Sequence, residues 1–239
     1  MRVLGFDTAT SATAVALLDF ATGTVHERRD DPPAGTRPHH TTHLLALITG
    51  VMSDAAAGWD AIDRIAVGTG PGTFTGLRIG IASAHALARA RGLPLVGVST
   101  LHGLALAAAG EAAAGERAVV AVIDARRGEL FAAAWAIDDV EAVDAEPLLA
   151  PAPFAPDELL TRVRALGSGV LVAGDGAVAW AQRFEDAGAR VAGENRVSAA
   201  PLCRLATQAT DLPGSPDGVA PDYLRAPDAK PRARTAVRV

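Results

Sequence analysis

Cysteine and aromatic residues are scarce in this 239-residue chain, which holds one cysteine, Cys203, and 4% aromatic residues. One thiol per chain can form neither an internal disulfide framework nor a thiolate metal cluster, so we expect a reducing, cytoplasmic setting. Basic residues are not in excess either, because 22 Lys and Arg stand against 27 Asp and Glu, a formal charge of -5. The overall field repels phosphate, and we do not expect the chain to bind RNA alone.

Long hydrophobic segments are interrupted throughout the sequence. The apolar run at the N-terminus reaches Asp7 before it attains the length of a signal-peptide core, so no export signal is predicted. Residues 92–110 contain no Asp, Glu, Lys or Arg, but Pro94, Ser99 and His102 divide them into a strand and a helix. We therefore expect no membrane contact. Hydrophobic residues make up 49% of the chain, which is enough to form one large core or two modest ones.

The order of the predicted elements indicates an α/β protein. The first half has three strands, a helix, a strand, a helix that ends near residue 91, and a strand: 2–8, 12–18, 24–29, 40–57, 62–67, about 77–91 and 95–98. Three antiparallel strands followed by helix-linked strands are typical of the half-domain of ribonuclease H-like and actin-like folds. In the second half we predict a helix at 157–166, a strand at 170–173, and helices at 177–188 and 200–210.

A second copy of the opening pattern begins at residue 118. The run 118–124 is a buried strand that ends in Asp124, as residues 3–7 end in Asp7, and a turn and a strand follow each. This suggests an internal duplication, although two short copies can also arise by chance. The predicted domains are an N-terminal lobe with dimerisation helices, a smaller α/β lobe, a C-terminal helix that packs back on the first lobe, and a basic flexible tail: 1–112, 113–198, 199–225 and 226–239.

A candidate phosphate site begins at Asp7, which closes a buried strand and precedes a tight turn rich in hydroxyl groups. Such a carboxylate can order the waters of a magnesium ion while turn amides and hydroxyls bind phosphate oxygens. Ala9 limits the approach of a phosphate where nucleotide-binding turns have glycine. A hairpin whose aspartate caps the turn explains the pattern equally well. The residues of this vestigial nucleotide cleft are Asp7, Thr8, Thr10, Ser11, Asp124, Gly174, Asp175 and Gly176.

The glycine-rich segment 70–76 opens a helix. Its free amide groups could receive an anion, with Arg78 close by. No lysine follows the glycines, so the segment is not a Walker loop. A glycine turn with a threonine cap also simply starts a helix, which leaves a packing role open.

Two helices carry stripes of apolar or small residues. Such stripes either pack inside the lobe or form a subunit interface shared by both helices. The expected interface residues are Leu44, Leu47, Ile48, Val51, Gly76, Gly80 and Ala84.

His39 and His43 are four residues apart and could face one metal ion on a helix. The residues between them supply no Glu base, unlike the zinc-peptidase pattern. We therefore interpret them as capping or surface histidines and predict no metal site.

Four segments resemble the TsaB (YeaZ) family: FDTAT at 6–10, GPGTFTGLRIG at 70–80, DARRGE at 124–129 and PDYLR at 221–225. The resemblance spans nearly the whole chain. It implies an actin-like ATPase (ribonuclease H-like) fold with two tandem α/β lobes. It also implies a part in making N6-threonylcarbamoyladenosine beside the anticodon, in tRNAs that read codons beginning with A. The implied partners are a TsaD-like catalytic paralogue and a TsaE-like ATPase, with tRNA contacted indirectly through the complex.

The catalytic paralogues of this family carry a His-x-x-x-His metal pair after the strand that follows the glycine helix. The corresponding positions here hold Thr100 and Leu104, and leucine cannot bind a metal. The resemblance therefore points to a non-catalytic dimerisation and scaffold subunit that needs no cofactor itself, with ATP and metal on the partner subunits. It places pairing, with TsaD or a second copy of this chain, on the two striped helices.

Two other functions stay open. An autonomous actin-like ATPase or phosphotransferase would bind a magnesium nucleotide at Asp7 and the turn 174–176. A metallopeptidase would need a ligand cluster that the sequence pattern does not supply.

Overall fold

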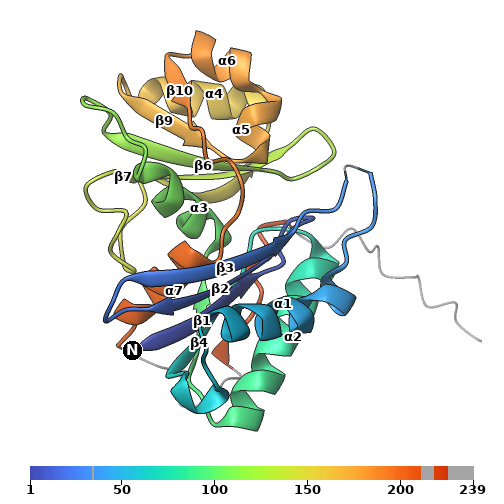
Figure 1. The fold of residues 1–239 in the computed structure, drawn as a ribbon. Coiled ribbons are helices and arrows are strands. Elements are labelled where there is room, and N and C mark those ends of the chain that lie inside the picture. The colour runs from blue at the N-terminus through green and yellow to red at the C-terminus, as the bar shows by residue number, and fades with distance from the viewer. Residues whose placement is uncertain (34, 211–217, 226–239) are drawn as a thin grey trace, which may run out of the picture.

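The computed structural model describes residues 1–33, 35–210 and 218–225. Two five-stranded sheets form two lobes, and helices cover both faces of each sheet (Figure 1). The basic tail expected at 226–239 lies outside the described residues. Among the helices of the described residues, none has the length and apolar character that crossing a bilayer requires.

The first sheet has the order β3-β2-β1-β4-β5. Its strands are β1 (Arg2–Asp7), β2 (Thr13–Asp19), β3 (Thr24–Asp30), β4 (Arg64–Gly68) and β5 (Leu95–Val98). β1 pairs antiparallel with β2 and parallel with β4, so it is the central strand and is buried on both faces. Helix-linked β4 and β5 run parallel, as expected when a helix returns the chain to the same edge.

Side chains of β1 alternate between two hydrophobic cores. Leu4 and Phe6 pack under α1 (His40–Asp54) and α2 (Phe74–Arg91), which lie together on one face of the sheet. Val3 points to the other face, where α7 (Ala200–Gln208) packs on the same sheet. This alternation follows from the two-residue period of a strand.

The second sheet repeats the arrangement of the first. Its order is β10-β9-β6-β7-β8, with β6 antiparallel to β7 and parallel to β9. The strands are β6 (Ala118–Asp124), β7 (Leu130–Ala136), β8 (Leu149–Phe154), β9 (Val170–Ala173) and β10 (Ala189–Val191). Equal order and direction in both sheets support the interpretation of an internal duplication.

Helix α3 (Thr100–Ala109) packs mainly on the second sheet. Its buried residues Leu101 and Leu104 share a core with Val119 of β6. On its other side, Gly103 lies against Leu202 of α7, so α3 and α7 stand between the two sheets (Figure 1). Most of the apolar surface that buries α3 belongs to β6, β7 and β9, so this part of the predicted range 1–112 packs mainly with the second lobe.

The far face of the second sheet is covered by α4 (Pro156–Ala165), α5 (Asp175–Ala179) and α6 (Ala181–Asp186). The single helix predicted at 177–188 is wrong, because Trp180 leaves helical geometry at φ -119° and ψ 22°. The helix predicted to reach residue 57 ends at Asp54, and Ala56 adopts a left-handed φ of 47°. A short 3-10 helix at Trp59–Ala61 delays the next strand to Arg64.

Candidate functional site

Asp7 ends β1 beneath the junction of the two lobes and is 1% exposed. Its Oδ1 accepts a hydrogen bond from the Ala9 amide at 2.7 Å, and its Oδ2 accepts one from the Thr100 hydroxyl at 2.7 Å. Burial raises the pKa of Asp7, while these two hydrogen bonds and the charge of Arg29 act in the opposite direction. Both carboxylate oxygens already have donors within the chain, so the structure favours the turn-capping interpretation over an open magnesium site.

Thr8 joins the same turn to the glycine-rich helix. Its hydroxyl donates to the Gly76 carbonyl at 2.8 Å. A Cβ at Gly76 would overlap the Thr8 carbonyl oxygen, and one at Gly80 would overlap the Thr8 hydroxyl. These two glycines therefore serve contact inside the lobe, because only a residue without a side chain lets α2 approach the turn this closely.

The helix start that could have received an anion is engaged within the chain. The Thr73 amide donates to the Ala9 carbonyl at 2.7 Å, and the Thr73 side chain caps α2 by accepting from the Gly76 amide at 3.2 Å. Arg78 lies over the Phe74 ring, 3.8 Å from its centroid, and donates to the Tyr223 hydroxyl at 3.1 Å. The structure thus supports the packing role of this segment.

The equivalent turn of the second lobe is more open. The Asp124 amide donates to Asp175 Oδ1 at 3.0 Å, and Asp124 Oδ1 accepts from the Arg126 amide at 2.8 Å. Burial raises the pKa of Asp175. The hydrogen bond from the Asp124 amide lowers this pKa, whereas the negative charge of the Asp124 carboxylate raises it. Gly174 and Gly176 on either side of Asp175 pack closely against β6.

A small pocket of about 110 Å³ lies between the lobes. It brings together three of the predicted cleft residues, Thr10, Ser11 and Asp175. Its other lining residues are Ala12, Arg29, Asp31, Leu104, Ile123, Asn195, Arg196 and Val197. Sites for drug-sized ligands occupy about 300 to 1,000 Å³, so this pocket has room for a few waters or a small ion but not for a nucleotide.

Charged residues that sequence reasoning missed close one side of this pocket. Arg29 pairs with Asp31 at 2.8 Å and also donates to the Val197 carbonyl, which joins β3 to the segment that returns from the second lobe. Arg196 extends the network to Asp31 at 3.8 Å. Local sequence gives no signal for this charged network, because Arg29 and Val197 are far apart along the chain and meet only when the chain folds.

The two positions that the resemblance assigns to a metal pair hold Thr100 and Leu104, whose side chains are buried inside the chain. Thr100 is buried against Asp7, and Leu104 is buried in the second core and lines the pocket. His102 is also buried: its Nε2 donates to the Val140 carbonyl at 2.8 Å and its ring stacks on Trp135 at 4.8 Å. Burial lowers the pKa of His102, more than the hydrogen bond to Val140 raises it.

The stripe on α1 faces the chain's own sheet, which corrects the expectation that it forms a subunit interface. Leu44, Ile48 and Val51 are buried in the core of the first lobe, and Leu47 is half-buried at its edge. Ala84 is buried in the same core, while Gly76 and Gly80 face Thr8. These residues pack within the lobe because the central sheet offers the nearest large apolar surface.

The four segments that carry the family resemblance meet in space. Residues 6–10 contact 70–80 through Thr8 and Gly76. The Asp222 amide donates to the Thr69 carbonyl at 2.8 Å, and Arg225 binds the Ala125 carbonyl at 3.1 Å and also Glu129. The segment 221–225 therefore ties the glycine-rich loop of the first lobe to the β6–β7 turn of the second.

Comparison with known proteins agrees with this arrangement. The family model described as "TsaD: tRNA N6-adenosine threonylcarbamoyltransferase" matches residues 32–152, just over half of the chain. The tRNA threonylcarbamoyladenosine biosynthesis protein TsaB of Escherichia coli K12 is 34% identical over 188 residues, 79% of this chain and 77% of that protein. The protein of the same name from Haemophilus influenzae is 36% identical over 132 residues, 55% of this chain and 52% of that one.

A solved structure extends the comparison to nearly the full chain. YeaZ from Pseudomonas aeruginosa superposes with a TM-score of 0.77 at 27% identity, covering 93% of this chain and 99% of that one. Two α/β lobes of equal topology, joined across a small cleft, define a protein of the actin-like ATPase fold. Within that class, the chain belongs to the TsaB (YeaZ) family of tRNA threonylcarbamoyladenosine biosynthesis proteins.

Proposed function

We propose that this chain is a non-catalytic dimerisation and scaffold subunit of a tRNA N6-adenosine threonylcarbamoyltransferase complex in the cytoplasm. It pairs with a TsaD-like catalytic paralogue, stabilises it and helps a TsaE-like ATPase to assemble. The tRNA is reached through the complex, in keeping with the net charge of -5. The ATP and the metal ion used in the transfer reaction are held by the partner subunits.

The filled cleft is the observation that carries this proposal. Asp7 is bonded to Ala9 and Thr100, and the pocket that holds the predicted cleft residues Thr10, Ser11 and Asp175 measures about 110 Å³. A transferase of this fold needs room there for a nucleotide-sized ligand and groups to hold a metal. Thr100 and Leu104, which stand at the family's metal positions, serve packing.

The exposed side of α1 and the start of α2 supply the pairing surface in this proposal. Leu45 on α1 is 59% exposed and Phe74 at the start of α2 is 51% exposed. Large apolar side chains on neighbouring helices favour contact with another protein surface. A second copy of this chain can use the same surface when the paralogue is absent.

Reconstitution tests the role directly. Cells depleted of this chain should lose threonylcarbamoyladenosine from tRNA, measured by mass spectrometry of nucleosides, and purified TsaD-like subunit alone should not restore it. A normal level after full depletion would overturn the pathway assignment.

Complexes carrying Asp175→Asn or Thr10→Ala should keep activity within about two-fold, because neither group takes part in transfer. A variant complex that assembles fully but is inactive would instead show that this chain contributes to catalysis.

Calorimetry with the isolated chain separates the scaffold role from an autonomous ATPase. Magnesium ATP should give no saturable heat, since a pocket of about 110 Å³ is below the range of about 300 Å³ and upward that small-molecule sites occupy. Saturable binding, abolished by Asp175→Asn, would support the ATPase instead.

A further inference from the structure

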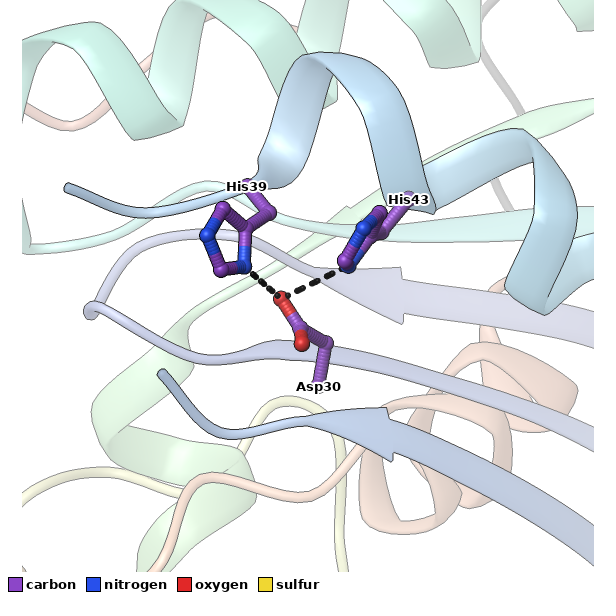
Figure 2. Close-up of side chains that lie close together, drawn as sticks. All are labelled: Asp30, His39 and His43. Atoms are coloured by element: carbon purple, nitrogen blue, oxygen red, sulfur yellow. Dashed lines mark hydrogen bonds and ion pairs between the residues drawn. The ribbon is translucent and has the colours of Figure 1, made fainter. Parts of the chain in front are cut away.

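Three side chains that can ligate a metal converge on the outer face of the first lobe (Figure 2). Asp30 is the last residue of β3, His39 precedes the first turn of α1, and His43 follows one turn later. Neighbouring residues on a strand point to opposite faces, so Asp30 turns toward α1 while Arg29 and Asp31 turn toward the cleft. The cluster is therefore separate from the pocket between the lobes.

Asp30 lies at nearly the spacing of a zinc ligand from each of the two histidines. Asp30 Oδ2 lies 3.2 Å from His39 Nδ1 and 3.1 Å from His43 Nδ1. Two ligands of a tetrahedral zinc ion, with bonds of about 2.0 to 2.1 Å, are about 3.3 to 3.4 Å apart. All three ligand atoms lie within 4.8 Å of one another. The proposed site therefore requires the two rings to rotate toward one ion, because 4.8 Å exceeds the spacing of two zinc ligands.

The surroundings of the cluster suit an exchangeable ion. The side chains of His39 and His43 are 45% and 46% exposed, so one side of the cluster is open to water. His39 makes no side-chain cap bond to α1, which leaves its ring available for a ligand role. His40 between them turns inward, with its Nδ1 2.8 Å from the Thr13 hydroxyl, and fixes the rotation of the helix start.

We propose that Asp30, His39 and His43 bind one Zn²⁺ ion, with a remaining coordination position open to water or to a donor from another molecule. Two imidazoles and a carboxylate are ligands that zinc accepts, whereas Mg²⁺ and Ca²⁺ prefer oxygen ligands alone. The bound ion ties the end of β3 to the start of α1 across the segment 31–38. The site stands apart from Thr100 and Leu104 and does not depend on the proposed function.

Zinc affinity of the full chain tests the site. The protein is prepared without a polyhistidine tag, stripped with a chelator and titrated with Zn²⁺ against a chromophoric competitor. We expect one ion per chain, and at least about ten-fold weaker binding for His39→Ala, His43→Ala and Asp30→Asn, because each removes a ligand. The matched control is His26→Ala on β3, outside the cluster, which should bind zinc like the unchanged chain. Excess Mg²⁺ should not compete.

Two outcomes overturn the proposal. One is equal zinc affinity in the unchanged chain and in the His39→Ala, His43→Ala double variant. The other is a control variant, His26→Ala, that loses as much affinity as the ligand variants. Circular dichroism without metal checks that all variants fold alike.

A second readout does not rely on any variant. Co²⁺ added to the stripped chain should give the visible absorption of a four- or five-coordinate site with nitrogen ligands, and Zn²⁺ should bleach it. Zinc should also raise the unfolding temperature, since an ion that binds only the folded state stabilises it. The weak spectrum of a six-coordinate aqueous ion, with no thermal shift, would contradict the site.

Discussion

The Thr100 hydroxyl donates to the Asp7 carboxylate across 2.7 Å, from the first residue of α3 to the last residue of β1. Thr100 stands where the family resemblance places a metal-ligating histidine in the catalytic paralogues. Here the position holds a neutral donor, and the carboxylate beside it is buried. This hydrogen bond ties the start of α3 to the end of β1.

The first prediction concerns the pH dependence of stability. Burial raises the pKa of Asp7 above its ordinary value of 3.8 in the folded chain. The folded state then holds the proton more tightly than the unfolded state, so the contribution of Asp7 is greatest below pH 3.8 and is lost as pH rises through the raised pKa. Asn at this position cannot ionise. The free energy of unfolding is measured by urea titration for the unchanged chain and for Asp7→Asn. The value for the unchanged chain minus the value for the variant should fall as pH rises. A difference that does not vary with pH would contradict this prediction.

The second prediction concerns the glycine helix. Gly76→Ala should lower the free energy of unfolding by about 1 to 3 kcal/mol or more, because the new methyl group would overlap the Thr8 carbonyl. Gly58→Ala is the matched control, since a Cβ there meets nothing within 4 Å. We expect the control to stay within about 0.5 kcal/mol of the unchanged chain in urea unfolding. Equal effects of the two changes would show that close packing of α2 on the turn does not matter.

The third prediction concerns the cysteine. Cys203 is fully buried between α7 and β1, and this burial raises the pKa of its thiol. A thiol reagent should therefore label it only when the chain unfolds, at a rate that rises with urea through the unfolding transition. Ala46→Cys on the exposed side of α1 should label at once in the native protein and serves as the positive control. Rapid native labelling of Cys203 would mean that α7 opens from the sheet on its own.

The fourth prediction concerns pairing. Leu45→Glu should abolish co-purification with the TsaD-like subunit and shift any homodimer to monomer in analytical ultracentrifugation, because an unpaired charge would be buried at the contact. Its effect on the monomer should be small, since Leu45 is 59% exposed. Leu148→Glu, at a residue 53% exposed near the start of β8, is the matched control and should pair normally. Pairing that survives Leu45→Glu would place the contact on another face.

Local pattern was enough to predict most of the elements. Continuous apolar runs ending in aspartate predicted the central strands β1 and β6, and Gly92 with its left-handed φ of 64° ended α2 where the sequence indicated. These features depend on neighbours along the chain, so periodicity and turn chemistry reveal them. Trp180 shows the limit of the method, because nothing local distinguishes a helix broken there from a continuous one.

The sequence by itself determined the α/β class, the opening strands of the two lobes and the family, because the glycine-rich and aspartate-ended segments are contiguous stretches that can be compared directly. Only the tertiary structure decided how those residues are used. It buried Leu44 and Ile48 inside the lobe, joined α3 to β1 through Thr100 and Asp7, and brought Asp30 to His39 and His43. Such contacts join residues that are distant in sequence or lie on different elements, and they depend on how the sheets and helices pack, which no local pattern specifies.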